Sequence, residues 1–288
     1  MKRVAVLLTC FNRKEKTRRC LKTLQLDQNK NCDVYLVNDG CTDGTKEMVE
    51  QEFPDVRVLQ GDGSLFWNRG MRFAFEEARK ESYDFYLWVN DDVIFESGVI
   101  PKMLEAYEHV SHEKKSEKVI VVGYTMDAEM KIVTYGGYRL VKSLIPIKLE
   151  MVQPSEKMEE CDTCNGNCVL ISAAVVDVIG TNCEHYHHSQ GDIDYGLSAK
   201  RAGCSVMLTN FAVGSCEKNE GARIWNDIRY KAPIREKMRV MNGLRHRPKE
   251  EWKYFTQKFG GRRWFLRYYL PYVKVYLSAI ISRLLGWR

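Results

Sequence analysis

The most informative stretch is Phe85-Tyr86-Leu87-Trp88-Val89-Asn90-Asp91-Asp92-Val93, an apolar run that ends in two adjacent carboxylates. A run of this length and residue type is typical of a buried strand. Carboxylates at the end of a buried strand are costly unless something compensates their charge. A divalent cation would do so, because Mg²⁺ and Mn²⁺ prefer oxygen ligands. A turn is the alternative, since Asn and Asp are common in turns, and this stretch alone favours neither.

Strands and helices alternate through the first third of the chain. Apolar runs predict strands at residues 4–8, 33–37, 56–59 and 85–89, separated by segments with helical spacing. The alternation predicts an α/β fold with a mostly parallel central sheet flanked by helices. Ligands of such sheets bind beyond the carboxyl ends of the strands.

Polar residues follow each of these four strands. In chain order they are Thr9 and Arg13, then Asp39, then Asp62 and Arg69 in a loop expected at residues 61–70, and finally Asp91 with Asp92. Any one of them alone is typical of a solvated loop, but four loops that meet at one edge predict a ligand site. The sequence has no Gly-x-Gly-x-x-Gly after the first strand and no Gly-x-x-x-x-Gly-Lys-Ser/Thr, which disfavours dinucleotide enzymes and P-loop NTPases.

Charge is distributed unevenly along the 288 residues, whose formal net charge is +6. No acidic residue follows Glu251, whereas eight Lys and Arg residues do, so the rest of the chain is slightly acidic. A terminal segment whose charges all have the same sign indicates binding to a partner or a surface, and says little about the fold. Nucleic acid is a poor fit, because large apolar residues outnumber the basic ones in this tail.

The cysteines do not form the pattern of a small disulfide scaffold. The N-terminal residues lack signal-peptide anatomy, so we expect a reducing compartment and free thiols. The spacing Cys161-x-x-Cys164-x-x-x-Cys168 resembles part of a metal knuckle, with His185, His187 and His188 as further candidate ligands. Zinc is the minor alternative here and buried thiols the major one.

Four motifs, in this order, resemble those of family 2 glycosyltransferases, which are inverting enzymes with the GT-A fold. They are Thr9-Cys10-Phe11-Asn12-Arg13, Val37-Asn38-Asp39-Gly40-Cys41-Thr42-Asp43-Gly44-Thr45, Asn68-Arg69-Gly70 and Val89-Asn90-Asp91-Asp92. The resemblance covers about residues 2–216, and the sequence resembles bacterial rhamnosyltransferase-like enzymes of surface polysaccharide assembly.

The resemblance implies a role for each of several residues. The nucleotide-sugar site would comprise Thr9, Phe11, Arg13, Asp39, Asn68, Arg69 and Asp91. Asp92 would be the principal carboxylate for a divalent cation, Mn²⁺ or Mg²⁺, and Asp192 the general base. The acceptor would contact Gly166, Asn167 and Trp67. Asp194 has a simpler interpretation, because a carboxylate at a helix start caps amides and complements the dipole.

The sequence departs from the family pattern at three positions. Asn38 stands where the family often has Asp, Gly191 replaces an acid that usually precedes the base, and Cys216 lies near a position that is His in many relatives. A cation would then have fewer protein ligands or a different one. His185, His187 and His188 are either histidines on the surface without a function or residues that recognise an acceptor hydroxyl or phosphate.

Two later segments have distinct patterns. Residues 142–160 have no clear hydrophobic periodicity, which predicts an extended loop over the site that orders on substrate binding.

Residues 262–287 are basic, aromatic and aliphatic, but Arg267 and Lys274 interrupt the apolar run, so a helix that spans a membrane is disfavoured. A helix in the headgroup region of an anionic membrane is favoured over one docked on the body or on a partner, and Pro271 would kink either.

The sequence as a whole predicts a cytoplasmic glycosyltransferase on the inner face of a membrane. Residues 1–245 would form the GT-A domain, with a nucleotide-sugar half (1–97) and an acceptor half (98–245), and residues 246–288 a helical tail. The donor would be a UDP-sugar or dTDP-rhamnose, and the acceptor a saccharide or lipid-linked saccharide of cell-surface polysaccharide or glycolipid synthesis. The alternatives are a sugar nucleotidyltransferase and a non-catalytic nucleotide-binding scaffold at the membrane.

Overall fold

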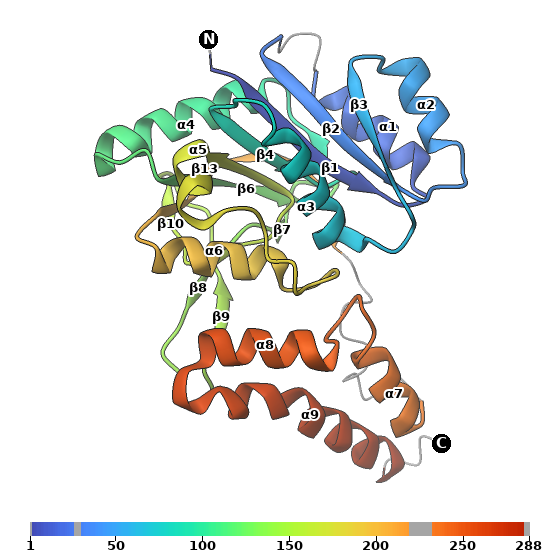
Figure 1. The fold of residues 1–288 in the computed structure, drawn as a ribbon. Helices are drawn as coiled ribbons and strands as arrows, with labels where there is room; N and C mark the ends of the chain where they lie inside the picture. Colours follow the sequence, from blue (N-terminus) through green and yellow to red (C-terminus); the bar gives the residue numbers. More distant parts are fainter. Residues whose placement is uncertain (1, 26–29, 219–231, 285–288) are drawn as a thin grey trace. The chain divides into compact units, whose positions relative to one another are not determined.

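The structure is a computed structural model that describes residues 2–25, 30–218 and 232–284 (Figure 1). The chain forms two compact units. The first comprises Met1–Arg139, Met151–Glu184 and Gly191–Lys218, and the second Leu140–Glu150, His185–Gln190 and Asn219–Arg288. The predicted division after residue 245 stays a prediction, and tail residues 285–288 lie outside the described part.

A large sheet forms the centre of the first unit, with strand order β10-β13-β6-β12-β4-β1-β2-β3. The four strands foreseen from the apolar runs are β1 (Val4–Cys10), β2 (Cys32–Asp39), β3 (Val56–Gly61) and β4 (Phe85–Val89), and they pair in parallel. Next to β4, β12 (Cys168–Ser172) runs antiparallel to both of its neighbours. Beyond it, β6 (Val119–Met126) and β13 (Ser205–Ser215) are again parallel to each other.

Helices cover both faces of this sheet (Figure 1). The side chains of α1 (Lys14–Thr23), α2 (Thr45–Glu52) and α4 (Val99–Lys114) pack in one core cluster, and those of α3 (Phe66–Ala78), α5 (Ala173–Ile179) and α6 (Gly191–Arg201) in the other. The alternating side chains of β1 show why the sheet has one core cluster on each face. Val4, Val6 and Leu8 belong to one cluster and Ala5 and Leu7 to the other, as the two-residue period of a strand requires. The predicted α/β fold with a central sheet flanked by helices is therefore confirmed.

The remaining strands are short. β5 (Ile94–Phe95) and β10 (Glu159–Glu160) pair with β13, and β7 (Val133–Tyr135) pairs with β6. A separate small sheet has the order β11-β8-β9, from Thr163–Cys164, Gly137–Leu140 and Leu149–Met151. The segment 142–160, expected to be one extended loop, therefore carries two short strands, and its place over the site stays a prediction.

One helix starts earlier than the sequence suggests. Residues 61–70 were expected to form a loop, but α3 begins at Phe66, so Trp67, Asn68 and Arg69 lie in its first turns. The reason is a long-range cap. The carboxylate of Asp39 accepts hydrogen bonds from the backbone N–H groups of Gly63 (2.8 Å), Leu65 (3.3 Å) and Phe66 (3.0 Å). These amides would otherwise lack partners at the start of a helix.

The second unit contains α7 (Ile234–Met241), α8 (Lys249–Gly260), the short 3₁₀ helix Gly261–Arg263 and α9 (Trp264–Leu284). The predicted C-terminal helix is therefore confirmed, and Pro271 lies inside α9 without ending it. Trp252 of α8 is buried and donates its indole N–H to the carbonyl of Tyr268 in α9 (3.1 Å). None of the helices in the described part of the chain is long and apolar enough to span a bilayer.

The histidine cluster helps to hold this unit together. The Nδ1 atom of His187 lies 2.6 Å from Oε1 of Glu251, which is buried on α8. The ring of His185 stacks on Tyr254, with ring centroids 4.1 Å apart. His185 is exposed, as a surface histidine would be, and both His185 and His187 contact α8. Recognition of an acceptor by the cluster stays a prediction.

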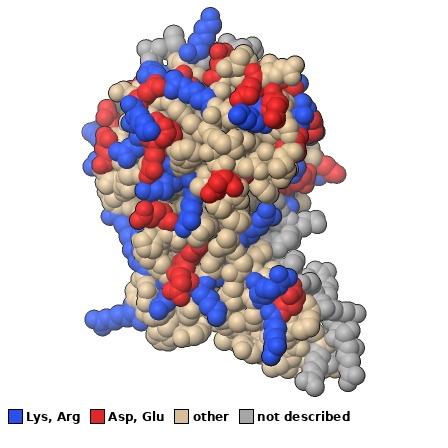
Figure 2. Space-filling view, turned by 45° about the vertical axis from the view of Figure 1, so that its right-hand side comes forward, with Lys and Arg blue, Asp and Glu red and all other residues tan. Residues whose placement is uncertain are grey.

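Charges of both signs are interleaved on the face that Figure 2 shows. Figure 2 shows Lys and Arg side chains next to Asp and Glu across the face in view. One group on the first unit joins Arg3 to Asp33 (2.8 Å) and to Glu81 (3.0 Å), and Glu81 also pairs with Arg57. Exposed pairs of this kind contribute little to stability.

Candidate functional site

The carboxyl ends of the parallel strands lie side by side, as expected. β1 pairs with β2 on one side, where Cys10 is opposite Asn38, and with β4 on the other. Arg13, Asp39 and the Asp91-Asp92 pair therefore lie at or just beyond the ends of three adjacent strands, at one edge of the sheet.

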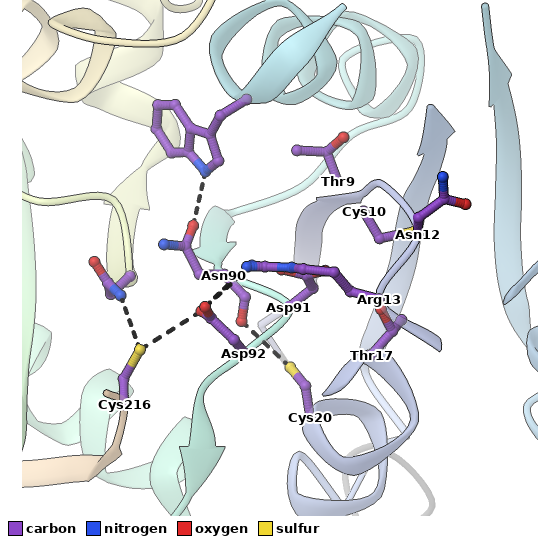
Figure 3. Close-up of polar contacts among 12 residues, drawn as sticks. Thr9, Cys10, Asn12, Arg13, Thr17, Cys20, Asn90, Asp91, Asp92 and Cys216 are labelled. Atoms are coloured by element: carbon purple, nitrogen blue, oxygen red, sulfur yellow. Dashed lines mark hydrogen bonds and ion pairs between the residues drawn. The ribbon is translucent and has the colours of Figure 1, made fainter. Parts of the chain in front are cut away.

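Arg13 joins the two adjacent carboxylates (Figure 3). Its Nη2 atom donates to Asp91 Oδ1 (2.7 Å) and to Asp92 Oδ2 (3.0 Å), Nε donates to Asp91 Oδ2 (3.2 Å), and Nη1 donates to Asp92 Oδ2 (2.9 Å). Burial opposes the charge on Arg13, but the two carboxylates outweigh it and raise the guanidinium pKa. This arginine therefore stays charged and neutralises part of the acidic pair.

The two carboxylates differ in environment. Asp91 is buried and also accepts a hydrogen bond from Thr17 Oγ1 (3.3 Å), and burial raises its pKa to about 6. Asp92 remains partly accessible, with 13% of its side chain exposed. Thr17 was not among the predicted site residues. Its position four residues after Arg13, on the same helical face, was the available signal.

Cys216 contacts Asp92 from the end of β13. Its thiol donates to Asp92 Oδ1 (3.5 Å), and the side-chain amide of Asn167 donates to the same sulfur (3.6 Å) (Figure 3). Burial, with Asp92 as a further cause, raises the pKa of Cys216 to about 12, so the thiol keeps its proton. A neutral thiol is a poor ligand for Mg²⁺ or Mn²⁺, which prefer oxygen.

The residues at this site fit a cation that is held partly by the protein and partly by a bound substrate. In the described segments, no group of three or more His, Cys, Asp and Glu side chains is arranged to hold a metal. This gives no support to a zinc site at Cys161, Cys164 and Cys168, all of which are buried. Of the two adjacent carboxylates, Asp92 is the more exposed, at 13% against 5% for Asp91, which suits Mg²⁺ or Mn²⁺ bound by one carboxylate and phosphate oxygens.

The remaining predicted nucleotide residues fall into two groups. Asp39 and Asn68 are buried, and each makes hydrogen bonds within the protein. Thr9 is buried at the end of β1, whereas Phe11 is 43% exposed. Arg69 is half-buried and forms no ion pair with any residue that the structure describes. Phe11, Arg13 and Arg69 are therefore the more exposed of the predicted nucleotide residues, and their role stays a prediction.

Asp192 occupies the first turn of α6. Its Oδ2 atom accepts the backbone N–H of Gly166 (3.2 Å), and Oδ1 accepts that of Ile193 (2.8 Å). The side chain is half-buried, and burial raises its pKa. A carboxylate with a raised pKa is a better proton acceptor near neutral pH. Asp194 of the same helix is buried and accepts from Ser198 (3.1 Å), in agreement with a structural role.

The predicted acceptor residues pack against one another. An added Cβ on Gly166 would lie 2.3 Å from the ring of Trp67, so only glycine lets this backbone approach the indole. The indole N–H of Trp67 donates to Asn90 Oδ1 (2.7 Å), next to the acidic pair. The acceptor role of these residues stays a prediction.

Comparison with protein families identifies the chain. The family model described as "Glycosyl transferase family 2" matches residues 5–177, which is more than half of the sequence. The chain belongs to glycosyltransferase family 2. Among curated proteins, this glycosyltransferase is 23% identical over 205 residues to N-acetylglucosaminyl-diphospho-decaprenol L-rhamnosyltransferase of two Mycobacterium tuberculosis strains, CDC 1551 / Oshkosh and H37Rv. The match covers 64% of the chain and 66% of either relative, slightly less than two thirds of their length.

Solved structures with a similar fold are also glycosyltransferases. One is a mannosyltransferase from Pyrobaculum calidifontis in complex with GDP-Man and Mn²⁺, with a TM-score of 0.57, 12% identity, and coverage of 99% of this chain and 75% of that one. Another is GalNAc-T7 with UDP, GalNAc and Mn²⁺, with a TM-score of 0.57, 10% identity, and coverage of 84% and 48%. The predicted GT-A fold is confirmed.

Two departures of this glycosyltransferase from the family pattern have a structural reason. Asn38 is buried and donates its amide to Gln60 Oε1 of the next strand (3.0 Å), a bond that an aspartate could not donate. At Gly191, an added Cβ would lie 1.8 Å from Asn68 Oδ1. That oxygen accepts from Asn182 (2.8 Å), and the Asn68 amide donates to the carbonyl of Cys183 (2.8 Å).

Placing a side chain at Gly191 should therefore destabilise this glycosyltransferase. We expect Gly191→Ala to lower the free energy of unfolding by about 1–3 kcal/mol, because the site is already filled. Chemical denaturation would measure the loss. In an Asn68→Ala background, which removes the clashing amide, the same substitution should cost much less. If Gly191→Ala lowered the free energy of unfolding equally in both backgrounds, Asn68 would not be the reason that position 191 needs a glycine.

Proposed function

We propose that this glycosyltransferase moves a sugar from a nucleotide diphosphate donor to an acceptor hydroxyl by single displacement, with inversion at the anomeric carbon. One observation carries the proposal. A two-residue segment connects the candidate base with the acidic pair, because Gly166 donates to Asp192 while Asn167 donates to Cys216, the thiol on Asp92. The base and the carboxylate for the cation therefore belong to one arrangement, as a displacement reaction needs.

In this mechanism Asp192 accepts the proton of the acceptor hydroxyl as its oxygen attacks the anomeric carbon. The nucleoside diphosphate departs with the electron pair of the broken bond. Arg13 and Arg69 bind its phosphates, since guanidinium groups suit phosphate oxygens. A Mn²⁺ or Mg²⁺ ion held through Asp92 would offset the charge that develops on the diphosphate.

The names of the relatives suggest the substrates. The rhamnosyltransferase is named for a rhamnosyl donor and a lipid diphosphate acceptor, and the two solved structures contain GDP-Man and UDP. We therefore propose dTDP-rhamnose or a UDP-sugar as donor and a saccharide or lipid-linked saccharide of the cell surface as acceptor.

A product assay tests the transfer. The full chain would be incubated with each nucleotide sugar, Mn²⁺ and a lipid-diphosphate saccharide, while nucleoside diphosphate is quantified and the new linkage is assigned by NMR. We expect acceptor-dependent release and an inverted anomeric centre. Pyrophosphate formed from a nucleoside triphosphate and a sugar phosphate would instead identify a nucleotidyltransferase, and binding without turnover a scaffold.

We further infer that α9 binds the inner face of an anionic membrane. The face of the helix that contains Pro271, Val275, Ser278 and Ser282 is buried within the second unit. The opposite face is apolar and exposed, and it includes Phe265, Leu266, Tyr269, Val273, Tyr276, Leu277, Ile280 and Ile281. Arg262, Arg263 and Lys274 are exposed on the same segment. Apolar bulk with only basic charge suits a headgroup layer that contains anionic lipids.

Acidic substitutions on this face should abolish membrane binding. Val273 and Ile280 are 50% and 54% exposed, so Val273→Glu/Ile280→Glu should leave the fold intact. We expect its binding to phosphatidylglycerol vesicles to fall at least about tenfold in co-sedimentation, since each buried aliphatic side chain is worth about 1.5–3 kcal/mol. Ile132→Glu, at an exposed residue of the first unit (63%), is the matched control and should bind normally. Failure of the wild-type protein to sediment with the vesicles would contradict the membrane assignment. So would a wild-type dimer that dissociates in the double variant, because the apolar face would then bind a second copy.

A further inference from the structure

Two cysteines meet where the loops after β1 and β2 come together. Cys10 is the last residue of β1 and is buried, whereas Cys41 follows β2 and is half-buried. Their sulfur atoms are 3.9 Å apart. A disulfide requires about 2.05 Å between sulfurs, so a shift of less than 2 Å would join them. Neither thiol has a role in the transfer reaction described above.

The surroundings of Cys41 favour its ionised form. The hydrogen bond with Cys10 is the largest cause, and the backbone N–H of Asn12 (3.2 Å) and the hydroxyl of Thr45 add to it, so that the pKa of Cys41 falls to about 7. For Cys10, the bond with Cys41 and burial raise the pKa instead. One sulfur is thus a partly exposed thiolate near neutral pH, and its neighbour is a protonated thiol.

Cys32 provides an internal comparison. It is also half-buried, at the start of β2, but burial raises its pKa to about 12. Two cysteines of similar exposure therefore differ in thiolate content at pH 7. Because the thiolate is the reactive species, Cys41 should react far faster than Cys32.

We propose that Cys41 and Cys10 form a reversible disulfide, in which Cys41 is the sulfur that a peroxide oxidises and Cys10 resolves the product. In the first step the Cys41 thiolate attacks one peroxide oxygen, the O–O bond breaks, and hydroxide leaves as water after gaining a proton, which gives a sulfenic acid. In the second step the Cys10 sulfur attacks Cys41, the S–O bond breaks, and the Cys10 proton leaves with hydroxide as water. The two thiols supply two electrons, and a dithiol reductant reverses the change.

The disulfide would alter the turn that carries Phe11 and Arg13. Asn12 has a left-handed backbone (φ 51°), and two bonds across the loops stabilise it. Its N–H donates to the Cys41 sulfur, and its Oδ1 accepts from the backbone N–H of Thr42 (2.7 Å). A disulfide moves that sulfur toward Cys10 and weakens the first bond. The expected consequence, weaker binding of a nucleoside diphosphate, rests on the proposed function, whereas the disulfide itself does not.

Mass spectrometry tests the cysteine pair directly. The full chain would be treated with equimolar hydrogen peroxide at pH 7, alkylated, and digested without reduction. We expect a peptide that joins Cys10 to Cys41 and disappears after dithiothreitol, while Cys32 remains alkylated. In Cys10→Ser, dimedone should trap a sulfenic acid on Cys41. In limited alkylation, Cys41 should react on the order of 100-fold faster than Cys32 or more. Absence of the joined peptide, or equal reactivity of Cys41 and Cys32, would overturn the proposal.

Nucleotide binding separates this proposal from the function on which its consequence rests. Failure to form the disulfide, with normal metal-dependent nucleotide binding in the reduced protein, would contradict the cysteine pair alone. A disulfide that forms in a protein that binds no nucleoside diphosphate would support the pair and contradict the proposed function.

Discussion

Replacing Asp192 by asparagine should lower turnover by about 10²–10⁴-fold, the range that general-base catalysis contributes, while the affinity for a nucleoside diphosphate stays nearly unchanged. Asparagine keeps the shape of the side chain, and its single oxygen can accept from either Gly166 or Ile193, but its amide cannot take a proton from the acceptor. Steady-state kinetics and calorimetric titration of the nucleotide would measure the two effects separately.

The pH profile gives a second expectation for the same residue. Burial raises the pKa of Asp192, and the base works only when ionised. Activity should therefore be lost as pH falls through this raised pKa, at a higher pH than the ordinary value of 3.8 would give. The asparagine variant should lose this acidic limb from its residual activity.

Asp194→Asn is the matched control, because it removes a carboxylate from the same helix and leaves Asp192 in place. Asp194 is buried and bonds Ser198, so we expect a lower melting temperature with turnover largely preserved. Near-normal turnover in Asp192→Asn, or equal losses in the two variants, would show that Asp192 is not the base.

Replacing Asp92 by asparagine should remove the metal-dependent part of nucleotide binding and lower kcat/KM by about 100-fold or more, since a cation of this kind is worth several kcal/mol. Asp92 is the more accessible carboxylate of the acidic pair, and Cys216 cannot replace it while its thiol keeps a proton. Titration of the nucleoside diphosphate with and without Mn²⁺ would measure the change.

Asp62→Asn tests whether the effect is specific to Asp92. Asp62 lies just beyond β3, where it is exposed and accepts only from Ser64 (2.8 Å from N, 2.7 Å from Oγ) among the contacts described. Its loss should leave the Mn²⁺ effect unchanged. An Asp92→Asn protein that binds nucleotide as tightly as wild type in Mn²⁺ would refute the assigned role.

Local sequence patterns predicted the parts of the fold that depend on short-range order. The apolar runs marked β1 to β4 correctly, and the rule that ligands bind at strand ends brought Arg13 together with Asp91 and Asp92. Motif order then predicted the family, which the comparison confirms.

Long-range contacts were beyond those patterns. Asp39 was expected in the nucleotide-sugar site, which stays a prediction, and its carboxylate also caps the start of α3 from the end of β2. Asn68 is buried against Asn182 and Cys183, more than a hundred residues away in sequence. His187 likewise finds Glu251 on a distant helix. The spacing of residues along a short stretch gives no information about partners that are distant in sequence. The residues around each side chain therefore could not predict these contacts.

For the C-terminal tail, too, the local pattern predicted the helix but not its packing. Its composition predicted a basic amphipathic helix, and α9 is a helix. Which face is buried depends on packing within the second unit, where Val275 is enclosed and Val273 is exposed. Only the structure could identify the apolar surface assigned here to the membrane.

Metal-dependent stabilisation by a nucleoside diphosphate is the most direct test of a nucleotide-sugar site at this sheet edge. The melting temperature would be measured with UDP, dTDP, GDP and CDP, each with and without Mn²⁺. A ligand at 100 times its Kd stabilises the native state by about 2.7 kcal/mol, which corresponds to a rise of about 5 °C or more. We predict such a rise for at least one of the four, only when Mn²⁺ is present. No rise with any of them, in either condition, would contradict the nucleotide-sugar site and with it the proposed transfer.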